Sequence, residues 1–191
     1  MNIDDTKLPA EQITAIARRI DRPVVLVGMM GVGKSSVGKR LASVLGCPFL
    51  DADDEIERSA RMTIPEIFES FGEDYFRDGE RRVIARLLEE DRGLKIIATG
   101  GGAFCNADTR ALILEKAIAV WLDSDVDTLV ERTSRKGNRP LLSQGDPREI
   151  LTRLRDERRP FYSLAPVHVH SGNGPHQRTV AKILRGIEKW L

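Results

Sequence analysis

The chain has 191 residues, with 30 lysines and arginines against 29 aspartates and glutamates. Its net charge of +1 excludes a general electrostatic attraction to nucleic acid or to an acidic membrane surface. This length is typical of one domain that buries a core without disulfides or metal staples, so we expect a single domain over residues 1–191. The two cysteines form no C-x-x-C pair, which suits a reducing cytosol. The sequence also shows no apolar run that could span a bilayer and no signal peptide, so we expect a cytoplasmic protein without membrane or nucleic-acid partners.

The first predicted element is a short amphipathic helix. Ile13, Ile16 and Ile20 recur on one helical face, which is typical of a helix that packs against a core. We interpret residues 1–21 as an N-terminal helical extension that precedes the first strand.

A phosphate-binding loop follows. Residues 28–35 read Gly-Met-Met-Gly-Val-Gly-Lys-Ser and match G-x-x-x-x-G-K-[ST]. The apolar run over residues 23–27 predicts a strand before the loop, and helical spacing up to about Leu45 predicts a helix after it. The glycines let backbone N–H groups turn toward phosphate oxygens, and the helix N-terminus adds the positive end of its dipole. Lys34 then reaches the β- and γ-phosphates of a nucleotide, and Ser35 offers its hydroxyl to Mg²⁺.

Two carboxylates come directly after the next strand, which we expect over residues 48–51. Ligands of open parallel sheets bind at the carboxyl ends of the strands, and alternation along an extended segment predicts that Asp51 and Asp53 face the same side. One carboxylate can hold Mg²⁺ or its water, and the other can accept a hydrogen bond from a substrate hydroxyl. The alternative is an acidic pair that only caps the following helix.

Strands and helices alternate along the rest of the chain. We expect helices within 54–91, strands at 94–98 and 117–122, a helix at 126–135, a polar loop at 136–146, a helix from 147 to about 159, a strand at 167–169 and a helix at 180–190. This alternation predicts an α/β doubly wound domain, in which helices cover both faces of a parallel sheet.

Asp123 is a second candidate for the magnesium carboxylate. It follows the apolar strand expected over 117–122, as the aspartate of a Walker B motif does. No glutamate follows it as a water-activating ATPase would need, and it can equally cap the helix after Ser124.

Three consecutive glycines, Gly100 to Gly102, end the strand at 94–98. They let a ligand approach the backbone and offer N–H donors to an anion, or they simply form a flexible turn. Arg77 and Glu80 share a helix face three residues apart, so the glutamate can orient the guanidinium toward a carboxylate. A solvated surface pair is the alternative for these two side chains.

Taken in order, these motifs resemble those of the shikimate kinases. The resemblance runs from about Val24 onward and rests on the phosphate-binding loop, Asp51-Ala52-Asp53, Phe76-Arg77-Asp78-Gly79-Glu80, Thr99-Gly100-Gly101-Gly102, Arg139-Pro140-Leu141-Leu142 and Arg158-Arg159-Pro160-Phe161-Tyr162. It implies a three-layer P-loop kinase fold with a five-stranded parallel core sheet and a mobile lid at about residues 136–146. It also implies Mg²⁺-dependent transfer of phosphate from ATP to the 3-hydroxyl of shikimate, within the biosynthesis of chorismate and aromatic amino acids.

The resemblance assigns nucleotide and metal ligands residue by residue. ATP would be bound by Gly31, Val32, Gly33, Lys34, Ser35, Ser36, Arg132 and Arg139, and Mg²⁺ by Ser35 and, through water, Asp51. Arg132 would lie beside the adenine ring, although a solvent-facing arginine on that helix is the alternative. Arg139 would close over the transferring phosphoryl group when the lid shuts, and with Lys34 and Asp53 it would form the catalytic set.

The acceptor side is assigned in the same way. Asp53 would bind the substrate hydroxyls and accept the proton of the attacking one, while Arg77, Arg158 and Gly100 to Gly102 would hold the substrate carboxylate. A gluconate kinase, a nucleotide kinase and a nucleotide-dependent switch without transferase activity remain as alternatives. We find no exposed heptad seam and expect a monomer.

Overall fold

The core of the computed structural model, which describes residues 8–91, 93–134 and 145–191, is a five-stranded parallel sheet in the order β2-β3-β1-β4-β5. The strands are β1 (Val24–Val27), β2 (Phe49–Asp51), β3 (Ile96–Ala98), β4 (Ile118–Asp123) and β5 (Val167–His170). β1 lies in the middle, and none of its residues is exposed. A strand that is covered on both faces needs apolar side chains throughout, which explains its unbroken valine and leucine run.

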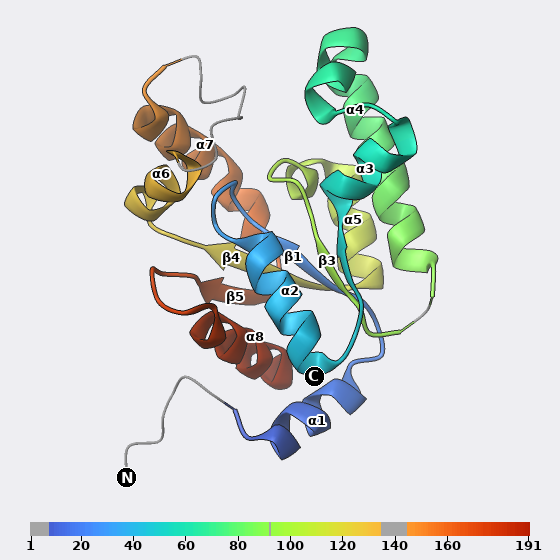
Figure 1. Ribbon diagram of the computed structural model, residues 1–191, viewed down its shortest axis with the longest axis vertical. Coiled ribbons are helices and arrows are strands. Elements are labelled where there is room, and N and C mark those ends of the chain that lie inside the picture. Colours follow the sequence, from blue (N-terminus) through green and yellow to red (C-terminus); the bar gives the residue numbers. More distant parts are fainter. Residues whose placement is uncertain (1–7, 92, 135–144) are drawn as a thin grey trace.

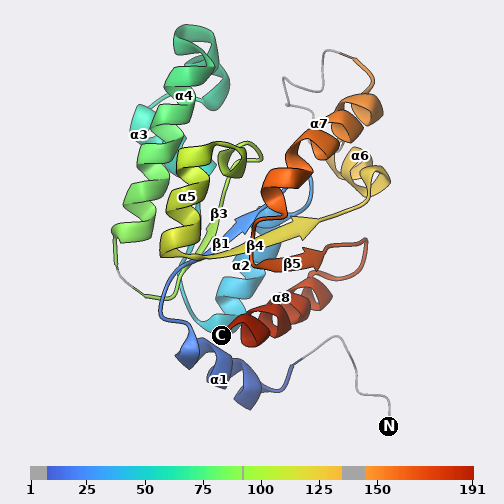
Figure 2. The ribbon, with the colours of Figure 1, turned by 180° about the vertical axis from the view of Figure 1, so that it is seen from behind.

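Helices cover both faces of this sheet, as the sequence predicts (Figures 1 and 2). One face carries α2 (Lys34–Leu45) and α8 (His176–Trp190), and the other carries α4 (Ile64–Glu89), α5 (Ala107–Lys116) and α7 (Pro147–Tyr162), while α1 (Ala10–Arg19) packs against α2 and α8. The remaining helices are α3 (Ala52–Ala60), α6 (Val126–Ser134) and the short 3₁₀ helix η1 (Ala103–Cys105). Within the described ranges, no helix is both long and apolar enough to cross a membrane.

The helix α5 was not predicted from the sequence. Its N-terminus has a recognisable cap, because the Asn106 side chain accepts a hydrogen bond from the Thr109 backbone N–H at 3.0 Å. Its apolar stripe is weak, however, and Thr109 and Ile113 are its only buried residues. Contact with α4 and β4 therefore stabilises this helix where its own pattern gives little signal.

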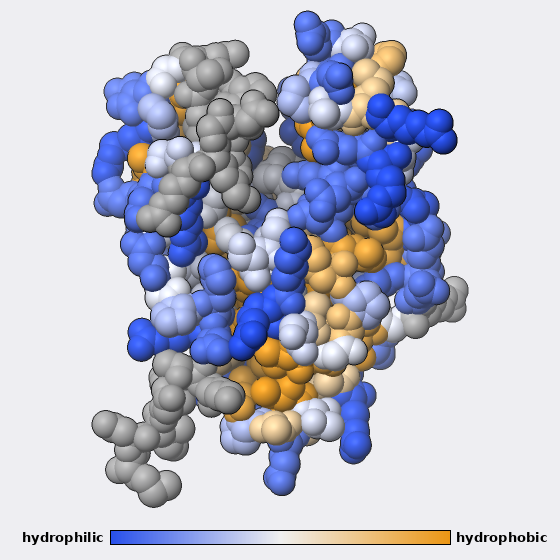
Figure 3. Space-filling view, viewed as in Figure 1, coloured by the Kyte–Doolittle hydropathy of each residue, from blue (hydrophilic) through white to orange (hydrophobic). Residues whose placement is uncertain are grey.

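The N-terminal helix α1 lies at the end of the sheet opposite the carboxyl ends of the strands (Figure 1). Ile16 is buried, and the Gln12 side chain donates a hydrogen bond to Glu188 on α8 at 2.9 Å. Between α1 and the end of α2, Ile13, Val44 and Leu45 line a pocket, and Figure 3 shows hydrophobic residues gathered low on this face of the molecule. The described part of the predicted extension, from residue 8 onward, is thus part of the packed structure.

The carboxyl ends of three neighbouring strands bring the predicted motifs together. β1 leads into the phosphate-binding loop, β2 ends at Asp51, and β3 leads into Gly100 to Gly102. Figure 1 shows α3 and the start of α4 on one side of this edge and α6 with α7 on the other. Ligand sites of open parallel sheets lie at this edge, between such flanking segments.

Candidate active site

The phosphate-binding loop depends on glycine for its backbone geometry. Gly28, Gly31 and Gly33 have φ angles of +135°, +80° and +99°, values that side chains other than glycine rarely adopt. A Cβ atom on Gly28 would also lie 2.3 Å from the carbonyl oxygen of Leu122. Gly33 is the N-cap residue of α2. The N–H groups of the loop therefore lie at the positive end of the helix dipole, where an anion is stabilised.

Lys34 lies inside this loop. Its side chain is almost fully buried, and Nζ donates hydrogen bonds to the carbonyl oxygens of Gly28 at 2.7 Å and Met29 at 2.9 Å. These bonds fix a positive charge beside the turned N–H groups of the loop. The arrangement suits a polyphosphate, because it brings a positive charge and several backbone donors close together.

Ser35 and Asp51 form an oxygen pair at the mouth of the loop. The Ser35 hydroxyl donates to Asp51 Oδ2 at 2.7 Å. Divalent cations such as Mg²⁺ prefer hydroxyl, carboxylate and water oxygens, and they usually use few protein ligands when phosphates supply the rest. The described residues contain no cluster of three or more histidine, cysteine or acidic side chains that could enclose a metal, so a magnesium ion at this pair would depend on the nucleotide for further ligands.

The local geometry of Asp51 and Asp53 differs from the prediction. Strand alternation does not relate them, because α3 already begins at Ala52 and Asp53 lies in its first turn. Asp51 is the N-cap residue, and its Oδ1 accepts a hydrogen bond from the Asp53 backbone N–H at 3.1 Å. Asp51 therefore caps the helix with one oxygen, while its other oxygen accepts the Ser35 hydrogen bond.

Asp53 points toward the glycine loop, residues 100–102. A Cβ atom built on Gly100 would lie 2.9 Å from Asp53 Oδ1, so only glycine allows this approach. Burial raises the pKa of Asp53, and the Asp51 carboxylate acts in the same direction while Lys34 opposes both. A carboxylate with a raised pKa is a better proton acceptor, which suits a general base.

Two arginines meet the same glycine loop. A Cβ atom on Gly102 would lie 2.4 Å from Arg77 Nη2, and one on Gly101 would lie 3.2 Å from Arg158 Nη1. Arg158 Nη1 is buried and has no hydrogen-bond partner among the described residues. Two guanidinium groups beside a bare backbone form a site for an anion, and a carboxylate matches them best because it accepts paired hydrogen bonds.

Glu80 orients Arg77, so the surface-pair alternative is wrong for these two side chains. Arg77 Nη1 donates to Glu80 Oε2 at 2.7 Å, and the side chains are 22% and 1% exposed. Burial raises the pKa of Glu80, although Arg77 acts against that change. Burial would lower the pKa of Arg77, but Glu80 and then Glu73 outweigh it and raise the pKa. Arg77 therefore remains charged at the edge of the glycine loop.

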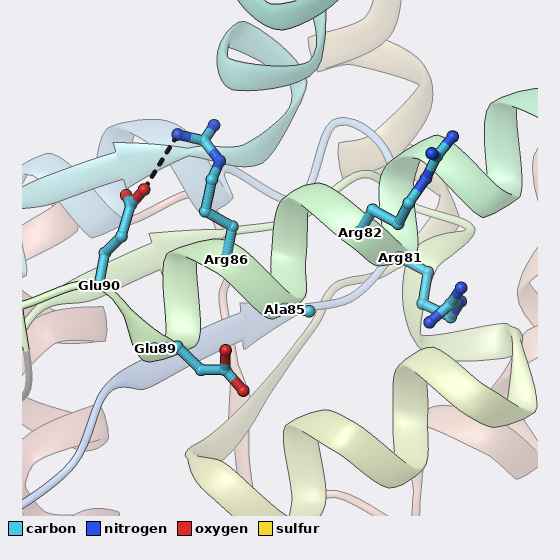
Figure 4. Close-up of a pocket in the computed structure, with 6 residues that line it drawn as sticks. All are labelled: Arg81, Arg82, Ala85, Arg86, Glu89 and Glu90. Carbon is cyan, nitrogen blue, oxygen red and sulfur yellow. Dashed lines mark hydrogen bonds and ion pairs between the residues drawn. The ribbon is translucent and has the colours of Figure 1, made fainter.

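A separate hollow runs along the outer part of α4 and is unrelated to this edge (Figure 4). Figure 4 shows Arg86 paired with Glu90 on one side of the helix, at 3.3 Å, while Arg81 and Glu89 extend on the other side. These side chains diverge and lie toward the end of α4 that leads into the start of β3. The candidate active site is therefore the cluster at the carboxyl ends of the strands.

Comparison with known proteins agrees with this geometry. The family model described as shikimate kinase matches residues 30–188. A shikimate kinase of Novosphingobium aromaticivorans is 65% identical over the full length of both chains, and one of Caulobacter vibrioides is 57% identical over 88% of this chain and 83% of its own. The chain belongs to the shikimate kinase family.

Solved structures extend this result to the fold. The structure of a shikimate kinase from Acinetobacter baumannii in complex with shikimate is 37% identical, with a TM-score of 0.84 over 95% of this chain and 98% of that one. A gluconokinase from Sinorhizobium meliloti is 20% identical, with a TM-score of 0.59 over 91% and 95% of the two chains. The likeness to the gluconokinase shows the shared fold alone. Together the two structures confirm the P-loop kinase fold that was inferred from the sequence.

Asp123 is held away from the role of a magnesium ligand in this shikimate kinase fold. Arg155 pairs with both of its carboxylate oxygens, at 3.3 Å and 3.0 Å, and Oδ1 also accepts the Ser124 backbone N–H at 2.9 Å. The likeness of β4 to a Walker B strand is therefore misleading. Asp123 serves to anchor α7, which carries Arg158, to the end of β4.

Arg132 makes a contact that the sequence did not predict. Its guanidinium donates to the carbonyl oxygens of Val32 at 3.0 Å and Gly172 at 2.8 Å. The buried Ser171 hydroxyl also donates to Val32 O at 3.3 Å. Arg132 thus ties the phosphate-binding loop to the segment after β5 instead of pointing into solvent.

Residues 136–144 of the predicted lid, Arg139 among them, lie outside the described residues. Ser36 follows Ser35 on the first turn of α2, and it lines a surface hollow with Lys39, Arg40 and His176. No role was predicted for Tyr162 from the sequence beyond its place in a motif. Its spacing of four residues from Arg158 is the signal that could have placed it on the same helix face.

Proposed function

We propose that this chain transfers the γ-phosphoryl group of ATP to the 3-hydroxyl of shikimate. Membership of the shikimate kinase family supports phosphoryl transfer from ATP, and the related structure in complex with shikimate supports the acceptor. The observation that carries the proposal is the meeting of Asp53, Arg77 and Arg158 at the glycine loop, next to the phosphate-binding loop. Asp53 could accept the proton of a hydroxyl, and the two arginines could pair with a carboxylate. This combination of groups suits a hydroxy acid.

The nucleotide side begins with positioning. The N–H groups of Gly31 to Gly33, with Ser36 on the first turn of α2, would face the phosphates, and Lys34 would turn from its carbonyl partners toward the β- and γ-phosphates. Because phosphoryl transfer needs placement and charge neutralisation more than covalent chemistry, a preformed cradle supplies much of what the reaction requires. Arg132, which already contacts the loop through Val32, would border the adenine ring.

Mg²⁺ fits the oxygen pair described above. The Ser35 hydroxyl would hold it directly and Asp51 would hold it through water, since their 2.7 Å hydrogen bond places two suitable oxygens together. When bound, Mg²⁺ neutralises charge on the β- and γ-phosphates. Asp51 also keeps Asp53 in place through the helix cap, so the two carboxylates have separate tasks.

On the acceptor side, Asp53 would hold the hydroxyls and take the proton of the attacking one. Its raised pKa makes it a stronger base than an exposed aspartate. Arg77 and Arg158 would bind the shikimate carboxylate, with Glu80 keeping Arg77 in place and Gly100 to Gly102 leaving room for the ring. Arg139, which belongs to the proposed lid at 136–146, would add charge at the transferring phosphoryl group on closure.

A coupled assay of ADP release tests the proposed function. With ATP and Mg²⁺ present, shikimate should stimulate release strongly, while gluconate and nucleoside monophosphates should not. Stimulation by gluconate or by a nucleoside monophosphate alone would mean that this compound, and not shikimate, is the acceptor. Slow ADP release that does not depend on any acceptor would favour a nucleotide-dependent switch. Chelation of Mg²⁺ should abolish the shikimate-dependent rate.

We also propose that the protein acts as a cytoplasmic monomer, as one domain over residues 1–191. Cys47 and Cys105 are free thiols, which supports a reducing compartment. Light scattering coupled to size exclusion would test the monomer directly. A concentration-independent mass of about 21.3 kDa is the expected result.

A further inference from the structure

Tyr162 lies where three parts of the site meet. It is on the last turn of α7, four residues after Arg158, and its side chain is 1% exposed. Its hydroxyl donates a hydrogen bond to the carbonyl oxygen of Gly101 and lies 3.9 Å from the sulfur of Met29 in the phosphate-binding loop. One side chain therefore touches both the glycine loop and the phosphate-binding loop.

The two loops also lie close to each other beside this tyrosine. A Cβ atom on Gly101 would lie 3.4 Å from the Met30 backbone nitrogen and 3.8 Å from the Gly28 carbonyl oxygen. A change in the orientation of the Gly101 peptide would therefore alter the position of the proposed acceptor relative to the phosphates. Such placement matters, because small errors in the alignment of reacting groups lower rates sharply.

The surroundings of Tyr162 keep it rigid and protonated. Its ring stacks on Trp121 of β4, with 6.0 Å between the ring centroids. Burial raises the pKa of its hydroxyl, and Cys105 acts in the same direction while Arg158 opposes both. The phenol therefore stays a hydrogen-bond donor across the physiological range, and Gly101 O keeps its partner.

We propose that Tyr162 is a positioning residue that fixes the Gly101 peptide against the phosphate-binding loop, and so aligns the acceptor pocket with the nucleotide. This inference rests on the proposed function, since it concerns placement of shikimate. Tyr162 would touch neither substrate and would act through Gly101 and, one helical turn away, Arg158.

The test is Tyr162→Phe, which keeps the ring and removes only the hydroxyl. Loss of one hydrogen bond to a buried carbonyl is expected to raise the KM for shikimate about tenfold, the equivalent of about 1.4 kcal/mol, while the KM for ATP stays within about twofold. A purely structural role would reduce the amount of active enzyme and leave both KM values unchanged. An unchanged KM for shikimate in folded Tyr162→Phe would overturn the proposal.

Tyr75→Phe is the matched control, because Tyr75 is the second of the chain's two tyrosines and is 52% exposed, stacked on Phe71. It should change neither KM. The wild type separates the two hypotheses: ADP release independent of shikimate would refute the proposed function, whereas shikimate-dependent release with an unchanged KM in Tyr162→Phe would refute only the positioning role.

A second measurement applies should Tyr162→Phe fail to fold. Difluorotyrosine, whose hydroxyl ionises more easily, can replace tyrosine throughout the Tyr75→Phe background, where only Tyr162 remains. The KM for shikimate should then rise as pH increases through ionisation of this hydroxyl, and the unsubstituted background should show no such rise. Identical KM values for the two proteins at a pH where the absorbance of the fluorinated phenol shows it to be ionised would overturn the proposal.

Discussion

Gly102→Ala is the sharpest test of the acceptor pocket, because the methyl group would collide with a single side chain. The new Cβ atom would lie 2.4 Å from Arg77 Nη2, 2.7 Å from Nη1 and 2.8 Å from Cζ. Gly102 has φ −93° and ψ −15°, a right-handed conformation that alanine adopts without strain. The collision must therefore be relieved by movement of the guanidinium, which sits at the end of a flexible chain.

The expected magnitude follows from that movement. Contacts between heavy atoms are favourable at about 3.5 Å or more, so the guanidinium must shift by roughly 1 Å. A hydrogen bond to a charged group contributes about 1.5–3 kcal/mol, which corresponds to about 10- to 150-fold in the KM for shikimate. The KM for ATP should stay within about twofold. The free energy of unfolding should fall by less than about 2 kcal/mol, since Arg77 can keep part of its pairing with Glu80.

Steady-state kinetics and urea unfolding of Gly102→Ala, Arg77→Ala and the double variant form the assay. If the methyl group acts through Arg77, the double variant should be no worse than Arg77→Ala alone. A double variant whose loss in KM for shikimate equals the sum of the two single losses, in free-energy terms, would refute the reasoning. An unchanged KM for shikimate in folded Gly102→Ala would refute it as well. Gly79→Ala is the control: a Cβ atom there meets nothing within 4 Å, so it should stabilise α4 by about 0.5–1 kcal/mol without changing either KM.

The remaining predictions concern Asp53 and α1. Asp53→Asn should lower turnover by at least about 100-fold while nucleotide affinity, measured by titration with a fluorescent ATP analogue, changes little; equal losses would mean that Asp53 is not the acceptor-side base. Burial raises the pKa of Asp53 above its ordinary 3.8, so the folded state favours the protonated carboxyl. The stability that this group contributes is therefore complete below pH 3.8 and is lost as pH rises through the folded-state pKa. Urea unfolding should therefore find Asp53→Asn more stable than the wild type at pH 8, by a margin that disappears toward pH 4, and the exposed Asp54→Asn should show no such margin. Ile16→Ala, at a buried position of α1, should cost about 2–5 kcal/mol of stability and leave both KM values unchanged, whereas a shift in either KM would give α1 a part in the site.

The parts of the site that the sequence predicted are those encoded by local spacing. The phosphate-binding loop needs glycines at fixed positions between a strand and a helix, and every one of these features lies within residues 23–45. The pairing of Arg77 with Glu80 follows from the helical repeat in the same way. Such patterns predict structure because neighbouring residues alone determine the geometry.

Contacts between distant segments were beyond local patterns. The strand β2 contains only three residues, and the acidic residues 51–54 fit either the end of a strand or the cap of a helix, so alternation wrongly related Asp51 to Asp53. The approach of Asp53 to Gly100, like that of Arg158 to Gly101, depends on how the strands and helices pack. α5 is a further case, since its weak apolar stripe leaves packing to decide whether a helix forms.

The role of the glycine loop also changes once the packing is known. Gly100 to Gly102 were interpreted as a turn or an anion-binding backbone, but their missing side chains also make space for four charged groups: Asp53, Glu80, Arg158 and Arg77. Glu80 Oε1 and Arg158 Nη1 are buried without a hydrogen-bond partner among the described residues, an arrangement that costs stability. A hydroxy acid could supply a carboxylate to the arginine and hydroxyls to the acidic groups, so this cost falls on the free protein and is relieved on binding. Under the proposed function, a ligand that carries both a carboxylate and hydroxyls would satisfy more of these groups than one that lacks either, which would favour a hydroxy acid as substrate.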